Sequence, residues 1–316
     1  MRRRITVRRV AGLAALVAAL LPLPAHAAQP ESRMLTLPSG ESLRVTTLGS
    51  GQPVVLVPGL FGAAYGFRKL MPCLATDGWR AIVIEPLGIG ESSRPGNADY
   101  SLTAQADRIA AAIEVMGLEH VIIAAHSVGA SIAYRLAFRH PERVEAIVSI
   151  EGGIAESAAT NGFRRAMKLA PLLKLFGVGC VRGKIRGQLK ERSADASWVT
   201  DEVVEGYTRG PAADLDATLT AYRRMGDSKE SEALAPRLRD VRCPVRLVLG
   251  AFPHPGGPKP EDVETLSRSV PQFSIDRVPG AGHFVFEEAP DAVVAAVRRA
   301  ADDASTARLA QAAGAR

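Results

Sequence analysis

The fold of this 316-residue chain is decided by one stretch, Val121-Ile122-Ile123-Ala124-Ala125-His126-Ser127-Val128-Gly129. Its first five residues form a continuous apolar run, which is typical of a strand buried in a parallel sheet. A helical pattern follows at 132–139, so a strand, a sharp turn and a helix are predicted in succession. The turn matches the nucleophile-elbow pattern G-x-S-x-G, with Ala125 in place of the first glycine.

The elbow needs small residues for a steric reason. Its serine sits in strained backbone geometry, so the residues two before and two after it must leave room for the turn. Ala125 and Gly129 meet that need. The start of the helix also presents the N–H of Val128 to developing negative charge. We therefore predict Ser127 as a nucleophile and Val128 as an oxyanion-hole donor; a plain structural turn is the alternative.

Short β-rich runs alternate with helical patterns along the chain, which favours a mostly parallel sheet flanked by helices. Strands are expected at 33–37, 42–48, 53–57, 81–84, 121–125, 144–150, 245–249 and 272–278, and helices at 104–116, 132–139 and 290–299. Between 154 and 235 the pattern becomes wholly helical, which indicates an insertion between two strands. We expect a core domain of 28–153 and 236–302, a helical cap of 154–235, and a flexible tail of 303–316.

The formal charge of +6 resides mainly at the N-terminus. Residues 1–27 hold five of the 39 basic residues and no acid, so the rest of the chain carries 34 basic against 33 acidic residues. A basic balance of this origin argues against nucleic acid as a partner.

The same segment has the anatomy of a secretory signal peptide. An arginine-rich start precedes an apolar run at 11–23 and the cleavage pattern Ala25-His26-Ala27. The run has about half the length of a membrane-spanning helix. We expect cleavage after Ala27 and a periplasmic or secreted protein; an uncleaved anchor is the alternative.

The cysteines Cys73, Cys180 and Cys243 are widely separated and show no CxxC spacing. Neither a zinc site nor a disulfide framework is indicated, although one bridge is feasible. We expect no metal and no cofactor. The sequence says nothing of the oligomeric state.

Four further motifs accompany the elbow. They are Val55-Leu56-Val57-Pro58-Gly59-Leu60-Phe61-Gly62, Glu85-Pro86-Leu87-Gly88-Ile89-Gly90-Glu91-Ser92-Ser93, Arg139-His140-Pro141-Glu142-Arg143-Val144 and Gly280-Ala281-Gly282-His283-Phe284. With these motifs the chain resembles the α/β-hydrolase superfamily over nearly all of its length after the leader. The resemblance implies an α/β-hydrolase fold: a mostly parallel eight-stranded sheet with helices on both faces and a helical cap between strands six and seven. It also implies Leu60 as the second oxyanion-hole donor, through its backbone N–H.

A serine hydroxyl needs a base to act as a nucleophile. His283 is the predicted base, because it lies late in the chain, in a glycine-rich loop after a strand, beside the apolar Phe284. His254 is the other candidate that remains after the histidines at element ends are set aside. His126 adjoins the serine, and we assign it to packing.

The acid departs from the commonest family pattern. The family usually places an aspartate soon after the seventh strand, where this chain has Pro253 and no carboxylate before Glu261. A second location is known at the end of the sixth strand, as in some haloalkane dehalogenase relatives, and Glu151 stands there. We predict Glu151 as the acid; Asp262 or Glu261, or no acid at all, are the alternatives.

The cap is strongly basic, with nine basic residues against one acid between Arg164 and Arg192. Its apolar residues are Phe163, Met167, Leu172, Leu173, Leu175 and Phe176. From this set and the neighbouring loops, we predict Phe61, Phe163, Phe176 and Phe284 as substrate contacts. The basic face either touches an anionic lipid or substrate, or is a solvated face that balances an acidic core.

These features together predict an exported serine hydrolase that cleaves a carboxylic ester of a small, largely apolar molecule. Amidase, lactonase, perhydrolase and C–C hydrolase activities use the same constellation. Dehalogenase and epoxide hydrolase chemistry is disfavoured, since those relatives use aspartate where this chain has Ser127. The alternative, from a different functional class, is a hydrolase-fold binding module with little or no turnover.

Overall fold

The computed structural model describes residues 29–159, 161–167 and 170–314, so the expected signal peptide lies outside the described residues. Its centre is an eight-stranded sheet in the order β1-β2-β4-β3-β5-β6-β7-β8. The strands are β1 (Glu31–Thr36), β2 (Ser42–Leu48), β3 (Pro53–Val57), β4 (Arg80–Ile84), β5 (Val121–His126), β6 (Val144–Ile150), β7 (Val245–Gly250) and β8 (Phe273–Val278). Strand β2 runs antiparallel to both of its neighbours, β1 and β4, and β3 to β8 run parallel to one another. The predicted fold class is confirmed.

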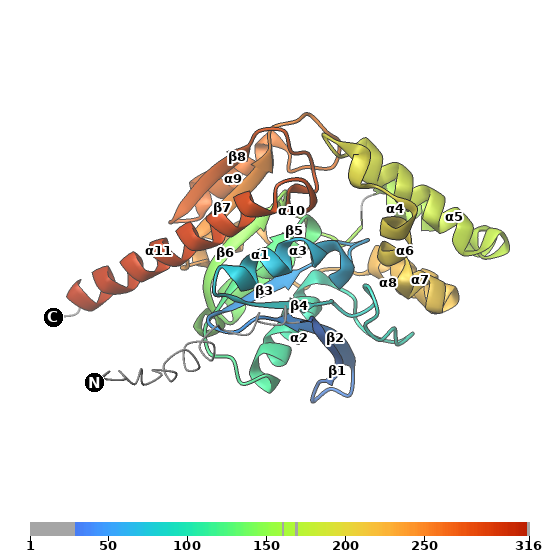
Figure 1. Cartoon of the computed structure of the whole chain (residues 1–316). Coiled ribbons are helices and arrows are strands. Elements are labelled where there is room, and N and C mark those ends of the chain that lie inside the picture. Colours follow the sequence, from blue (N-terminus) through green and yellow to red (C-terminus); the bar gives the residue numbers. More distant parts are fainter. Residues whose placement is uncertain (1–28, 160, 168–169, 315–316) are drawn as a thin grey trace, which may run out of the picture.

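Helices cover both faces of this sheet (Figure 1). Alternate residues of a strand point to opposite faces, and here they belong to two separate buried clusters. Val55 and Val57 pack on one side with helices α2 (Leu102–Val115), α3 (Val128–Arg139) and α9 (Pro260–Ser269). Val54 and Leu56 pack on the other side with α1 (Leu70–Thr76), α10 (Val285–Glu288) and α11 (Pro290–Gly314). Burial on both faces explains why the parallel strands read as unbroken apolar runs.

A cap lies between β6 and β7, as expected. It consists of α4 (Asn161–Met167), α5 (Ala170–Glu191), α6 (Asp201–Tyr207), α7 (Arg209–Ala213) and α8 (Leu215–Asp227), with no strand among its described residues. These helices gather at one side of the molecule, away from the C-terminal end of α11 (Figure 1). Gly177, with the non-helical angles φ 67° and ψ −170°, breaks α5 into two helical parts.

The last helix differs from the sequence-based prediction. The tail expected at 303–316 is helical as far as Gly314, because α11 continues past residue 299. Its extension is held by packing and charge: Ala304 is buried, and Asp303 and Arg308 pair with Arg246 and Glu145. Among the described residues, no helix is long and apolar enough to cross a membrane. All three cysteines are free thiols.

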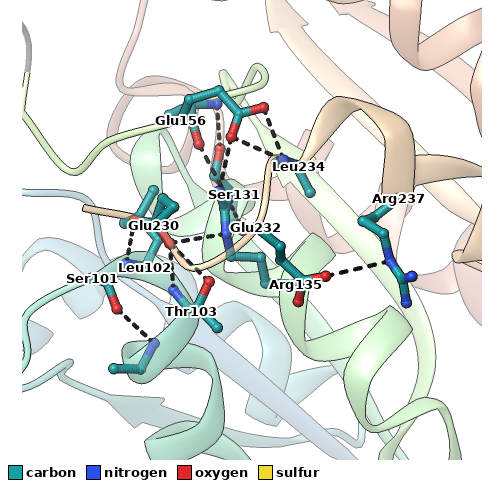
Figure 2. A network of polar contacts seen from close by, with 12 residues as sticks. Ser101, Leu102, Thr103, Ser131, Arg135, Glu156, Glu230, Glu232, Leu234 and Arg237 are labelled. Atoms are coloured by element: carbon teal, nitrogen blue, oxygen red, sulfur yellow. Dashed lines mark hydrogen bonds and ion pairs between the residues drawn. The ribbon is translucent and has the colours of Figure 1, made fainter. Parts of the chain in front are cut away.

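A buried arginine attaches both ends of the cap to the core (Figure 2). Arg135 of α3 has a fully buried side chain, and its guanidinium pairs with Glu156 at 3.2 Å and with Glu230 at 3.3 Å. Glu156 precedes the first cap helix and Glu230 follows the last one. One charged group on the helix that begins at Val128 therefore fixes the segments that lead into and out of the cap.

The two carboxylates also accept backbone hydrogen bonds at helix starts. Glu230 accepts from the N–H groups of Leu102 and Thr103 at 2.7 and 3.0 Å, where α2 begins. Glu156 accepts from the N–H of Leu234 at 2.8 Å. Negative charge is favourable at a helix N-terminus, because the first N–H groups have no partner within the helix. Each carboxylate of the network therefore has backbone N–H partners in addition to the charge of Arg135.

We predict that Arg135→Met lowers the free energy of unfolding by roughly 3 kcal/mol, because it leaves a buried carboxylate without its counter-charge. The matched control is Arg139→Met, one turn further along α3, where the arginine is 32% exposed and pairs with Asp107. That change should cost less than about 1 kcal/mol. Urea unfolding of both variants measures the difference, and equal losses would contradict the assigned role of Arg135.

Candidate active site

Ser127 lies at the turn between β5 and α3, with φ 53°. Its N–H donates to the carbonyl oxygen of Ile150 at 2.9 Å, which ties the turn to the neighbouring strand. A Cβ added at Gly129 would lie 2.8 Å from the Val57 carbonyl oxygen, so only glycine fits two positions after the serine. The local geometry is that of the elbow predicted from the sequence.

Glu151 ends β6 in the same way. Its φ of 52° makes it, with Ser127, one of two non-glycine residues at positive φ among the described residues. Such a conformation costs of order 1–3 kcal/mol and is concentrated at functional sites. Since β5 and β6 are parallel neighbours, the two strained residues lie at the same edge of the sheet. In open α/β sheets this edge is where ligands bind.

His283 follows β8 and is brought to the same place. It is 2% exposed, and its backbone N–H donates to the Arg192 carbonyl oxygen at 2.8 Å. Its ring atom Nδ1 lies 3.7 Å from Oε2 of Glu151 and is buried without a hydrogen-bond partner. Catalytic hydrogen bonds are often long in the absence of substrate. The geometry therefore pairs the predicted base with the predicted acid.

The carboxylate of Glu151 is held from two sides. Its Oε1 accepts the N–H of Gly250 at 2.5 Å, and its Oε2 lies 3.3 Å from Nε2 of His254. His254 is therefore nearer to Glu151 than His283 is, a position that does not follow from the sequence. Its only sequence signal is its proximity to Pro253, where the family usually has its acid.

The other acid candidate lies elsewhere. Asp262 accepts the N–H of Lys259 at 3.3 Å and helps to begin α9. Among the ion pairs of the described residues, His283 has Glu151 as its carboxylate partner and Asp262 has no histidine. Of the acids considered from the sequence, Glu151 is the one that the fold places beside His283.

The loop that carries Leu60 passes directly against the serine. A Cβ added at Gly59 would lie 3.2 Å from Cβ of Ser127. Leu60 and Val128 both line the cavity described below, and neither N–H is used in the hydrogen bonds of the described residues. Both N–H groups are therefore available as donors, as the predicted oxyanion hole requires.

Glu85 fixes the far end of that loop. Its Oε1 accepts the N–H of Ala64 and its Oε2 accepts the N–H of Glu91, both at 2.6 Å. Burial raises the pKa of this carboxyl to about 7, although the two N–H donors act to lower it. The acid that stands in the family-like loop at 85–93 therefore connects that loop to the one that carries Leu60.

His126 packs on the base. Its Nε2 lies 3.1 Å from the His283 carbonyl oxygen, and the two ring centroids are 4.6 Å apart. Phe284 and Phe286 complete this buried group of rings. These surroundings fit the packing role expected for His126. Its ring packs against the loop that carries His283.

A cavity of about 580 Å³ opens above Ser127 and His283, between the core and the cap. Phe61, Phe163 and Phe284, three of the predicted substrate contacts, line it. Phe61 and Phe163 pack edge to face at 5.6 Å, and Tyr222 of α8 joins them. The side chain of Phe176, the fourth predicted contact, lies outside the described part of the chain. The size and apolar walls are typical of a small-molecule site.

The electrostatics favour a neutral base. Burial, followed by the electrostatic effects of Arg192 and of His254, lowers the pKa of His283 to about 3. Burial also raises the pKa of Glu151, although the N–H of Gly250 and the nearby His254 act to lower it.

The atoms of Glu151, His254 and His283 that could bind a metal lie within 4.8 Å of one another. Two imidazoles and a carboxylate are a donor set that zinc accepts. A cation there would occupy the same histidine nitrogen and carboxylate that form the pair described above. The absence of a metal stays a prediction from the sequence.

Comparison with known proteins places this geometry in a class. The family model for the alpha/beta hydrolase fold matches residues 52–170. A 2-(acetamidomethylene)succinate hydrolase from Mesorhizobium japonicum is 27% identical over 264 residues, which cover 81% of this chain and 90% of that protein. A 2-hydroxymuconate semialdehyde hydrolase from a Pseudomonas species is 29% identical over 161 residues, about half of each chain (50% and 53%). The structure of Cfl2 from Burkholderia cenocepacia superimposes with a TM-score of 0.71 and 24% identity, over 85% of this chain and 94% of that one.

The sheet, the elbow and the inserted cap define an α/β-hydrolase fold. The family model matched at residues 52–170 describes this same fold, and the relatives named above are similar to the chain over half of its length or more.

The lowered pKa of His283 generates a prediction for pH dependence. A base must be neutral to accept a proton, so a lowered pKa keeps it competent at lower pH. With a pKa near 3, kcat/KM should stay nearly constant between pH 7 and pH 5. With an ordinary histidine of pKa about 6.5 as the base, kcat/KM would fall roughly 25-fold over that interval. A pH profile of kcat/KM, which reports ionisations of the free enzyme, measures this; an acid limb centred near pH 6.5 would contradict it.

Proposed function

We propose that the protein is a serine hydrolase that cleaves a carboxylic ester, or a related acyl bond, of a small and largely apolar substrate. The observation that carries the proposal is the approach of Glu151 Oε2 to His283 Nδ1, at 3.7 Å, beside the cavity that Ser127 lines. A nucleophile, a base and an acid that orients the base are the three parts of a hydrolytic triad.

In this proposal Ser127 Oγ attacks the acyl carbon while His283 takes its proton. Glu151 holds the imidazole in the tautomer that leaves Nε2 free to accept that proton, and it stabilises the imidazolium that forms. The N–H groups of Leu60 and Val128 hold the oxyanion, and each such donor is typically worth roughly 3 kcal/mol of barrier. His283 then gives its proton to the leaving oxygen. A water activated by His283 releases the acid from the Ser127 ester and restores the enzyme.

The type of bond is part of this proposal, because the superfamily relatives named above include hydrolases of several kinds. The serine at the elbow supports acyl transfer, since it can form an ester intermediate. The relatives' names support a small organic substrate, and a cavity of about 580 Å³ has room for one. The competing function is a binding module without turnover; the paired His283 and Glu151 favour the enzyme.

We also propose export, on the strength of the leader-like segment 1–27. Cell fractionation with N-terminal sequencing of the mature protein tests it. A chain that starts at Ala28 outside the cytoplasm is expected, and an intact chain in the cytoplasm would exclude export.

Labelling with a fluorophosphonate tests the nucleophile. The purified protein should gain the mass of one phosphonyl group, since an activated serine attacks phosphorus as it attacks an acyl carbon. Intact-mass spectrometry and peptide mapping should place the label on Ser127. An unlabelled protein, or equal labelling of Ser127→Ala, would remove the basis for the enzyme.

Two isosteric variants test the acid. Glu151→Gln should lower kcat by about 10⁴-fold, because loss of the acid leaves the wrong histidine tautomer. Asp262→Asn is the matched control and should change kcat less than threefold, since it lies at the start of α9. Thermal unfolding of both variants monitors the fold. The reverse order of effects would transfer the role to Asp262.

A further inference from the structure

One face of α5 carries polar residues into an otherwise apolar cavity. Lys184, Gln188 and Arg192 line the cavity, and Arg192 directly follows the last residue of this helix. They are four residues apart, so they lie along one side of the helix. We call these three residues the polar α5 face. It looks into the same cavity as Ser127 and His283.

Within the described part of the chain, the guanidinium of Arg192 has no hydrogen-bonded partner. No side-chain hydrogen bond or ion pair is found for it among the described residues, and its Nε is buried with no hydrogen-bond acceptor. One terminal nitrogen lies against the loop after β7: a Cβ added at Gly256 would be 3.0 Å from Nη1. A buried donor without an acceptor costs free energy that a bound acceptor would recover.

The other arginines of α5 behave differently. Arg186 pairs with Asp201 at 2.5 Å and Arg182 lies 3.9 Å from Glu205, on helix α6. Both are therefore accounted for by contacts within the cap. The contrast singles out Arg192 as the arginine of this stretch that faces the cavity and has no carboxylate at hydrogen-bonding distance.

The charge of the cavity lining also favours an anionic ligand group. Its described lining includes the cations Lys184 and Arg192 and contains no aspartate or glutamate. Arg192 is also near enough to His283 to lower the pKa of that imidazole, and its carbonyl oxygen accepts the N–H of His283. A ligand group bound by Arg192 would thus lie close to the reacting atoms.

We propose that the polar α5 face binds a carboxylate of the substrate, so that the enzyme prefers esters that carry a second, ionised carboxyl group. The guanidinium supplies a charge-assisted, bidentate contact for this group. The Lys184 ammonium adds charge and the Gln188 amide adds a donor. The inference rests on the proposed function, and it adds an anionic end to a substrate that is otherwise apolar.

The test compares matched esters, one charged and one neutral. One pair carries the charge on the acyl side: mono-para-nitrophenyl glutarate and para-nitrophenyl pentanoate. The second pair carries it on the leaving group: para-carboxyphenyl pentanoate and phenyl pentanoate. In at least one pair the wild-type kcat/KM should favour the charged ester by about tenfold or more, which is the effect of one charge-assisted hydrogen bond.

Arg192→Gln should remove most of that preference, chiefly through a higher KM for the charged ester. Arg192→Lys should retain part of it, since the charge remains but the bidentate contact is lost. The control is Arg186→Gln on the same helix, whose ratio of charged to neutral ester should equal that of the wild type. Equal rates within both wild-type pairs, or a preference that survives Arg192→Gln, would overturn the inference.

A binding arm separates this inference from the proposed function. Glutarate should bind to Ser127→Ala protein, measured by calorimetry, and at least tenfold more weakly when Arg192→Gln is added. If no ester is hydrolysed but glutarate binds through Arg192, the hydrolase proposal fails and the anion site stands. If esters are hydrolysed but glutarate binding does not depend on Arg192, the anion site fails and the hydrolase stands.

Discussion

The site depends on one constraint: two neighbouring parallel strands must each end in a side-chain-bearing residue at positive φ. Ser127 and Glu151 satisfy it, at the ends of β5 and β6. Glycines make it feasible, because a Cβ added at Gly152 would lie 2.2 Å from Cβ of Ala130. The strain of order 1–3 kcal/mol at each residue is carried by a sheet whose central strands are buried on both faces. The outcome is that the backbone of two buried strands positions Ser127, the proposed nucleophile, and the carboxylate of Glu151.

The cap is attached to the core at two places close to Ser127 and His283. Arg135, on the helix that starts at the elbow, fixes the chain where it enters and leaves the cap. At the other end, the backbone of Arg192 binds the loop of His283. Helices α5 and α8 then supply walls of the cavity. A displacement of the cap would therefore alter both the substrate space and the surroundings of the base.

Most of the sheet and part of the candidate site could be predicted from local patterns in the sequence. Apolar runs and a small-residue turn are local patterns, so the strands, the elbow and the position of Glu151 follow from them. The proximity of His254 to Glu151 depends on the path of the loop after β7, which no local pattern specifies. The same holds for Arg192: nine basic residues lie between Arg164 and Arg192, but only the packing of α5 shows that Lys184 and Arg192 line the cavity. The full length of the last helix does not follow from the sequence, because its contacts, such as Arg308 with Glu145, join segments far apart in the chain.

The central claim is that Glu151 orients His283 in the working enzyme. Proton NMR of the fluorophosphonate-inhibited protein, with its imidazole protonated, examines this contact directly. We predict a strongly deshielded Nδ1–H resonance of His283 that is lost in Glu151→Gln and kept in Asp262→Asn. A resonance that persists unchanged in Glu151→Gln would contradict the account.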